Sequence, residues 1–162
     1  MLTVRKARQP DLEQFHAWRN DPVVVASSFT QGEIDLQDHQ HWFLNKLADA
    51  DCGLYVVEFD EVAAGQVRFD IDGSVAKINY SLDAAFRGRG LATGSMTRAI
   101  ATFCEEYGNV ASLVAFVKPE NVASCRVFEK LGFDLDGFDN DVQANRYRVD
   151  IAELPVDQPS GD

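Results

Sequence analysis

The chain has 162 residues, 46% of them hydrophobic and 25% charged, a balance typical of one globular domain with its own core. The 15 basic and 26 acidic side chains give a formal net charge of −11 at pH 7, so the surface repels phosphate backbones and we expect no nucleic acid partner. Apolar runs are shorter than the roughly 20 residues of a membrane helix, and the first ten residues do not resemble a secretion signal. We therefore expect a cytoplasmic protein that does not bind membranes.

The cysteines Cys52, Cys104 and Cys125 are odd in number, far apart and without a C-x-x-C spacing. This pattern argues against both a disulfide framework and a zinc site. Each cysteine lies in an apolar segment, so we expect buried free thiols and no bound metal.

The first part of the chain predicts a strand over residues 2–6 and then a helix from Pro10 that ends near Pro22, since proline disfavours helix in the residue before it. Residues 23–32 are apolar without a clear period, and we predict irregular structure there. Asp35 is placed to cap a second helix. Three strands are then expected over residues 54–59, 64–70 and 75–82.

The pattern next changes to a long helix over residues 90–107, which Gly108 ends. Residues 113–117 are all apolar, as is typical of a central strand covered on both faces. A further helix, a closing hairpin and a polar tail are expected over residues 121–131, 133–138 with 146–151, and 155–162.

This order of elements predicts an α/β fold (a mixed α+β sheet, mostly antiparallel) with helices on both faces. We expect residues 1–154 to form one domain and the tail, residues 155–162, to be disordered.

A glycine-rich segment follows the third of these strands and opens the long helix. It reads Arg87-Gly88-Arg89-Gly90-Leu91-Ala92. The first turn of a helix has unpaired N–H groups and a partial positive charge, and glycines let an anion approach them. A plain glycine turn with two solvated arginines is the alternative, but the strand–loop–helix context favours a pyrophosphate cradle.

Two motifs carry a resemblance to the GCN5-related N-acetyltransferase (GNAT) superfamily. Arg87, Gly90 and Ala92 stand at the defining positions of its Q/R-x-x-G-x-G/A signature, and the stretch from Asn121 to Phe133 resembles its second recognisable segment. The resemblance implies a GNAT fold, splayed between strands four and five, that binds acetyl-CoA as cosubstrate without a metal. It also implies direct transfer to a primary amine, with catalysis largely by proximity.

The resemblance further implies which residues meet acetyl-CoA. The backbone around Asn79 would polarise the thioester carbonyl, as in an oxyanion hole. Asn121 would tether the cofactor, although it is also placed to cap its helix. The implied cofactor-binding residues are Tyr80, Ser81, Leu82, Arg87, Gly88, Arg89, Gly90, Leu91, Ala92, Asn121, Ser124 and Phe128.

The proton-transfer residues depart from the family pattern. Many members carry a tyrosine where this chain has Phe128, and a glutamate where it has Lys77. Neither the usual acid nor the usual base therefore transfers, and water, Ser124 or Cys125 remain open as proton donors. The candidates for the base are one of two histidines, His39 or preferably His41, and Asp70. The histidines are two residues apart and cannot share a helix face, which argues against a metal pair.

The segment from Trp18 to Pro22 resembles a W-R-N-x-P element of amino-sugar nucleotide acetyltransferases of pseudaminic acid-type pathways. Arginines suit a diphosphate and aromatic faces suit a nucleobase. The candidate substrate residues are thus Trp18 (which is also placed to be core), Arg19, Phe29, Trp42, Arg68 and Phe69.

Three functions remain open. The first is acetylation of a small-molecule amine, possibly a nucleotide-linked amino sugar. The second is acetylation of a protein N-terminus or another small amine, which the acidic surface would suit. The third is a non-catalytic acetyl-CoA sensor, which Phe128 and Lys77 keep open. We expect a monomer or a homodimer joined through the closing strands.

Overall fold

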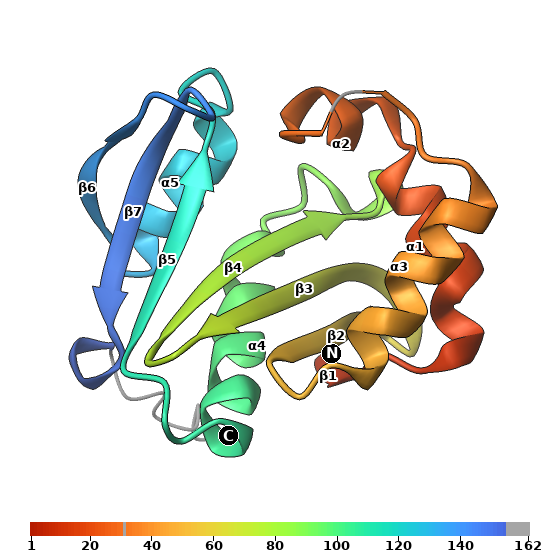
Figure 1. The fold of residues 1–162 in the computed structure, drawn as a ribbon, viewed down its shortest axis with the longest axis horizontal. Helices are drawn as coiled ribbons and strands as arrows, with labels where there is room; N and C mark the ends of the chain where they lie inside the picture. The colour runs from red at the N-terminus through yellow and green to blue at the C-terminus, as the bar shows by residue number, and fades with distance from the viewer. Residues whose placement is uncertain (31, 155–162) are drawn as a thin grey trace.

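A computed structural model describes residues 1–30 and 32–154, and the expected tail lies outside them. A seven-stranded mixed sheet forms the body of the molecule, in the order β1-β2-β3-β4-β5-β7-β6 (Figure 1). Its β4–β5 pair is parallel and its other neighbours are antiparallel. This confirms the predicted mixed α/β fold. The strands are β1 (Leu2–Lys6), β2 (Cys52–Phe59), β3 (Val62–Asp72), β4 (Val75–Leu82), β5 (Ser112–Val117), β6 (Asp134–Asp139) and β7 (Ala144–Asp150).

Helices cover both faces of this sheet (Figure 1). One apolar cluster joins the sheet to α4 and α5, and a smaller one joins it to α1 and α3. Short 3-10 turns occur at Gln9–Asp11, Ala84–Phe86 and Ile151–Glu153. The helices are α1 (Leu12–Arg19), α2 (Pro22–Ser27), α3 (Leu36–Ala48), α4 (Ala92–Glu106) and α5 (Val122–Lys130).

The helix α2 corrects the prediction of irregular structure after Pro22. The Asp21 carboxylate accepts a hydrogen bond from the backbone N–H of Val23 at 2.9 Å and caps the helix. Pro22 occupies the first helical turn, where a missing N–H costs nothing. The proline that ends α1 therefore also begins α2.

The strands β4 and β5 separate soon after they meet. They pair over residues 75–77 of β4 and 112–114 of β5, and then diverge as β4 continues to Leu82 (Figure 1). This confirms the predicted splay. The divergence frees one edge of β4 and creates a wedge between it and α5.

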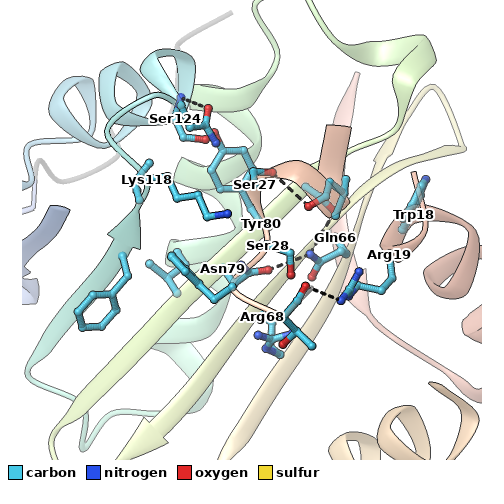
Figure 2. Close-up of a pocket in the computed structure, with 18 of the residues that line it drawn as sticks. Trp18, Arg19, Ser27, Ser28, Gln66, Arg68, Asn79, Tyr80, Lys118 and Ser124 are labelled. Carbon is cyan, nitrogen blue, oxygen red and sulfur yellow. Dashed lines mark hydrogen bonds between the residues drawn. The ribbon is translucent and has the colours of Figure 1, made fainter. Parts of the chain in front are cut away.

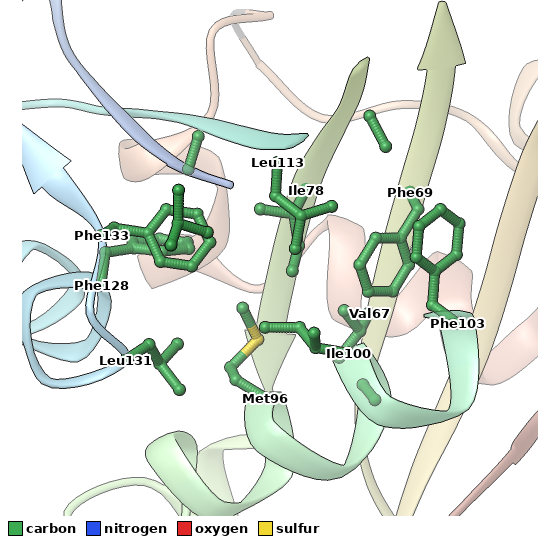
Figure 3. Close-up of a cluster of buried hydrophobic side chains, with 14 of the residues drawn as sticks. Val67, Phe69, Ile78, Met96, Ile100, Phe103, Leu113, Phe128, Leu131 and Phe133 are labelled. Atoms are coloured by element: carbon green, nitrogen blue, oxygen red, sulfur yellow. The ribbon is translucent and has the colours of Figure 1, made fainter. Parts of the chain in front are cut away.

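The main core lies between the sheet and the α4–α5 layer (Figure 3). In it the Phe69 ring stacks on the Phe103 ring, with centroids 4.0 Å apart and planes 4° from parallel. Phe69 is fully buried, so the prediction that it offers a face to a nucleobase is wrong. Alternation along β3 explains the error, because Phe69 points to the side opposite Arg68 and Asp70.

The three cysteines are free thiols, as expected, and Cys52 and Cys125 are buried, whereas Cys104 is only partly buried. Burial raises the pKa of Cys52 to about 11, and the Cys125 thiol is buried 3.9 Å from the carbonyl oxygen of Lys118. The raised pKa keeps the Cys52 thiol protonated and unreactive at neutral pH.

Candidate active site

A cavity of about 430 Å³ opens where β4 leaves β5. One wall is the polar face of β3 and β4. The other walls come from α1, α2, α3 and the loop before it, the end of β5, and α5 (Figure 2). It brings together eleven of the residues singled out from the sequence: Trp18, Arg19, Phe29, Trp42, Arg68, Asn79, Tyr80, Ser81, Asn121, Ser124 and Phe128.

The wall formed by β3 and β4 is a ladder of paired polar side chains. Arg68 stands opposite Asn79, and Gln66 stands opposite Ser81. The Gln66 amide donates to Asn79 Oδ1 at 3.3 Å and to Ser81 Oγ at 3.2 Å. Because β5 has already diverged here, the β4 backbone at Asn79 can offer its free edge to a ligand.

The far wall of the wedge belongs to α5. The Tyr80 hydroxyl lies 2.8 Å from Ser124 Oγ, and the Tyr80 ring meets the Phe128 ring edge-on at 5.9 Å. Burial raises the pKa of Tyr80. Asn121 Oδ1 accepts the backbone N–H of Ser124 at 3.3 Å, so Asn121 does cap α5. Its amide nitrogen remains available for a second contact.

The cavity is positive although the whole protein is strongly acidic. Arg19, Arg68 and Lys118 line it, and among its described lining residues there is no Asp or Glu. Arg19 donates to the carbonyl oxygens of Thr30 at 3.2 Å and Gly32 at 3.3 Å. Burial lowers the pKa of Arg19, but a guanidinium remains charged at neutral pH.

The other two cations lie beside aromatic rings. The Arg68 guanidinium stands 5.2 Å from the centroid of the Trp42 ring. Lys118 Nζ donates to the carbonyl oxygen of Ala26 at 3.0 Å and lies 5.9 Å from the Phe29 ring centroid. The cavity therefore pairs positive charge with flat apolar surfaces.

The histidine in the cavity is His39, and the preference for His41 is wrong. His41 is exposed and lies 3.2 Å from the Asn45 amide. His39 is only 2% exposed, and its Nε2 has no hydrogen-bond partner in the described part of the chain. Burial, aided by His16 and Arg19, lowers its pKa from 6.5 to about 4, so the imidazole is neutral at physiological pH.

Asp70 is not placed to act as a base. Its carboxylate accepts from Lys46 Nζ at 2.7 Å and from Arg68 Nε at 2.9 Å. Burial alone would raise the pKa of Asp70, but the two cations outweigh it and hold the pKa below its usual value. Asp70 is outside the cavity lining, so its role is to orient Arg68, and the prediction of catalysis is corrected.

The glycine-rich segment lies between β4 and α4. Gly88 and Gly90 both have a backbone φ of 72°, a conformation that residues other than glycine rarely adopt. A Cβ atom at either position would meet no described protein atom within 4 Å. The two glycines thus keep the surface before α4 open and low. The rest of the segment is Arg87, Arg89, Leu91 and Ala92, and the whole segment, like Leu82, lies outside the cavity lining.

Arg87 ties this segment to β4 and to α2. Its Nε donates to the carbonyl oxygen of Leu82 at 3.1 Å. Its Nη2 lies 3.0 Å from Asp21 Oδ1 and forms an ion pair with it. Arg89 instead packs over the rings of Phe59 and Phe86, 5.2 and 5.3 Å from their centroids.

The cavity residues that were not among the preferred site residues predicted from the sequence include His39, Gln66 and Lys118. His39 lies four residues before the buried Phe43, a spacing that places both on one helix face. Gln66 alternates with Val67 and Phe69 along β3, so the strand period would have assigned it to the polar face. Lys118 directly follows the apolar strand β5, and its placement depends on a contact 92 residues away in sequence.

Two absences concern the described residues only. They contain no cluster of three or more His, Cys, Asp or Glu side chains suited to a metal ion. Among their helices, none is long and apolar enough to cross a membrane.

Solved structures with a similar fold include several acetyltransferases. Spermidine N-acetyltransferase from Vibrio cholerae, in complex with coenzyme A and spermine, has a TM-score of 0.81 at 20% identity, covering 93% of this chain and 96% of its own. Aminoglycoside acetyltransferase AAC(6')-Ib, in complex with coenzyme A, has a TM-score of 0.79 at 22% identity, and the match covers 94% of this chain and 96% of its own. RimL, a ribosomal L7/L12 alpha-N-protein acetyltransferase in complex with coenzyme A, has a TM-score of 0.81 at 21% identity, and the match covers 93% of this chain and 94% of its own.

No curated protein sequence matches the chain. The family model described as "Acetyltransferase (GNAT) domain" matches residues 1–134, from β1 to the start of β6. The match includes the open segment before α4 and the start of α5, which forms the far wall of the wedge. The chain therefore belongs to the GNAT acetyltransferase family, and acetyl-CoA is its cosubstrate.

Proposed function

We propose that this acetyltransferase transfers the acetyl group directly to the primary amine of an acceptor that also carries negative charge, and that this acceptor is an amino-sugar nucleotide. One observation carries the proposal. Three cations and no described carboxylate line the cavity of a protein with a net charge of −11. A protein this acidic has a locally positive cavity only because these particular side chains converge there.

A polycationic acceptor fits this cavity poorly. Spermine and aminoglycosides, which accompany similar folds in solved structures, carry several ammonium groups. Such groups need carboxylates or carbonyls, and like charges at close range are repelled. Arg19, Arg68 and Lys118 favour instead a ligand with phosphate or carboxylate oxygens.

The aromatic rings support the nucleotide part of the proposal. Trp42 and Phe29 lie beside Arg68 and Lys118 respectively, so each cation has a flat apolar surface next to it. A nucleobase offers a flat face for such a ring, while its diphosphate meets the adjacent charge. Asn79, Gln66 and Ser81 add the amide and hydroxyl groups that recognise sugar hydroxyls.

The chain's own groups support direct transfer. The free edge of β4 near Asn79 can donate a backbone N–H to the oxygen on which charge develops. The neutral His39 and the polar ladder of β3 and β4 can orient the acceptor. Holding the amine and the thioester together accounts for most of the acceleration expected of such a site.

A thiol-release assay with acetyl-CoA and matched amines tests this proposal. The amines are a nucleotide-linked amino sugar, the same amino sugar without its nucleotide, spermidine, an aminoglycoside, and a peptide with a basic N-terminal sequence. We expect the nucleotide-linked sugar to have the highest kcat/KM. A preference for spermidine or the aminoglycoside contradicts it, a preference for the peptide supports the protein N-terminus, and binding of acetyl-CoA without any turnover supports a sensor.

Arginine variants sharpen the assay. Arg19→Met and Arg68→Met each remove a charge-assisted contact and should raise the KM for the nucleotide-linked sugar roughly ten-fold or more, with little change for acetyl-CoA. The control is Arg146→Met, because Arg146 pairs with Asp136 on the β6–β7 hairpin, outside the cavity lining. Equal effects of all three changes would mean that overall charge, and not the cavity, governs binding.

A further inference from the structure

We propose that Tyr80 is a catalytic residue that protonates the departing thiolate, and that Ser124 positions it. The proposal rests on acetyl transfer within the wedge between β4 and α5. It answers a question that Phe128 raises, because this side chain has no proton to give at the position where many family members carry a tyrosine.

The position of the phenol is the first argument. The Tyr80 side chain extends from β4 across the wedge to α5, where its hydroxyl lies 2.8 Å from Ser124 Oγ (Figure 2). Both residues line the cavity. Phe128 lies one helical turn after Ser124 on the same face of α5, and its ring meets the Tyr80 ring edge-on. Tyr80 thus brings a phenol to this face from the opposite wall.

The second argument is that one hydrogen of the Tyr80–Ser124 hydroxyl pair is not used between the two oxygens. Two hydroxyls at 2.8 Å share one hydrogen between their oxygens, and the second hydrogen is left for another acceptor. If Ser124 donates to the Tyr80 oxygen, the phenol proton can point into the wedge. Burial raises the pKa of Tyr80, which keeps the phenol protonated at neutral pH.

The other proton donors nearby are engaged elsewhere. The Cys125 thiol is directed at the Lys118 carbonyl oxygen, and the Lys118 ammonium lies beside the Ala26 carbonyl oxygen and the Phe29 ring, where we propose that it meets the acceptor. Ser81 Oγ accepts a hydrogen bond from the Gln66 amide on the opposite face of β4. Of the described groups in the wedge, the Tyr80 phenol is therefore the best placed donor.

Atoms and electrons balance in the transfer step. The acceptor nitrogen forms a bond to the acetyl carbon, the carbon–sulfur bond breaks, and its electron pair goes to sulfur. The Tyr80 proton moves to sulfur and gives the thiol, while the new amide nitrogen loses its proton to water. A phenol is a weaker acid than a thiol, with ordinary pKa values of about 10 and about 8.5, and burial raises the pKa of Tyr80 further. Transfer is therefore completed only as solvent returns a proton to the Tyr80 oxygen. Ser124 stabilises that oxygen in the interval.

A binding experiment that needs no acceptor tests the contact with sulfur. Titration calorimetry compares coenzyme A with desulfo-coenzyme A in the wild type and in Tyr80→Phe. We expect Tyr80→Phe to weaken coenzyme A about five-fold, the effect of one lost hydrogen bond, and to leave desulfo-coenzyme A unchanged. Equal losses for both ligands, or no loss for either, would overturn the proposal even if the acceptor remains unidentified.

Kinetics test the chemical role on whichever amine is turned over. Tyr80→Phe should lower kcat by about 10²-fold or more with a small change in the KM for acetyl-CoA, and Ser124→Ala should have a smaller effect on kcat. The double variant Tyr80→Phe with Phe128→Tyr returns a phenol to α5 and should recover at least about ten-fold in kcat. Tyr107→Phe is the matched control, because its hydroxyl donates to the Cys52 carbonyl oxygen away from the cavity. A Tyr80→Phe enzyme with wild-type kcat would overturn the proposal.

Discussion

The guanidinium of Arg87 lies 3.0 Å from the carboxylate of Asp21, and this ion pair joins two regions for which we propose different ligands, the cofactor and the acceptor. Arg87 belongs to the open segment before α4. Asp21 caps α2, and Val24 and Ser27 of that helix line the cavity. The pair therefore links α2, which lines the cavity, to the arginine of the segment that we propose as the pyrophosphate cradle.

We predict that removing the charge of Asp21 weakens acceptor binding. Asp21→Asn keeps an oxygen for the Val23 N–H and so retains the cap, but it loses the ion pair with Arg87. We expect the KM for the acceptor to rise roughly three- to ten-fold, since an ion pair that is only partly exposed contributes about 1 kcal/mol. Steady-state kinetics at saturating acetyl-CoA measures this change.

A second helix cap provides the control for this prediction. Asp35→Asn alters the cap of α3, where the carboxylate accepts from the Asp38 N–H without an arginine partner among the described residues. This variant should keep the wild-type acceptor KM. Asp21→Ala removes cap and ion pair together and should cost about 1 kcal/mol more in stability. If Asp21→Asn behaves like Asp35→Asn, the ion pair does not link the two regions.

The cradle itself is tested at its second glycine. Gly90→Ala forces a side chain into φ of 72° and places a methyl group on the open surface. We expect a loss of about 1–2 kcal/mol in the free energy of unfolding and a rise in the dissociation constant of coenzyme A of about ten-fold or more, because the methyl group obstructs the pyrophosphate. Calorimetry and urea unfolding measure the two effects separately.

Gly73 offers a matched control for backbone strain. It has φ of 62° in the β3–β4 turn, and a Cβ atom there also meets no described atom within 4 Å. Gly73→Ala should lose similar stability yet bind coenzyme A as the wild type does. Unchanged coenzyme A affinity in Gly90→Ala would show that the pyrophosphate lies elsewhere.

Local patterns in the sequence were sufficient for most of the fold. The strands and long helices follow from hydrophobic period and from caps such as Asp35, which act within a few residues. The short helix α2 was missed because Pro22 was taken only as the end of α1. An Asp-Pro pair also begins a helix well, and choosing between the two needs the tertiary contacts of α2.

The site was harder to predict because its contacts are distant in sequence. The Asp70 carboxylate is held by Lys46, 24 residues away, and Tyr80 meets Ser124 44 residues away. No local pattern encodes such pairs. The errors at Phe69 and His41 differ in kind, since strand alternation and helix spacing would have placed Phe69 and His39 on buried faces.

The two phenylalanines that the sequence suggested for the acceptor site should respond differently to mutation: Phe69 through stability and Phe29 through acceptor binding. Phe69→Ala empties a core position against Phe103 and should cost about 3–5 kcal/mol in the free energy of unfolding. Phe29, 42% exposed and beside Lys118, should cost less than about 1 kcal/mol when changed to Ala but raise the acceptor KM. Urea unfolding and kinetics on both variants check this. A large stability loss in Phe29→Ala would contradict the assignment of that ring to the acceptor site.

Protonation of His39 should set the response of the fold to mild acid. The pKa of His39 is lowered by burial from 6.5 to about 4. Between these pH values, His39 is therefore protonated in the unfolded chain but neutral in the folded chain. Stability therefore falls as pH decreases through this window, by about 3 kcal/mol in total. Urea unfolding at several pH values from 7.5 down to 4.5 measures the slope, and stopping there avoids the range in which Asp11 and Asp70, with lowered pKa values, begin to lose their ion pairs.

His39→Leu should flatten this pH dependence. The unpaired Nε2 lies among the rings of Trp42 and Phe43, so an apolar replacement leaves no buried donor unsatisfied and should change stability little at pH 7.5. His41→Gln alters the exposed histidine two residues away and should keep the wild-type slope. If His39→Leu loses stability toward pH 4.5 as steeply as the wild type does, the buried imidazole is not the group that titrates.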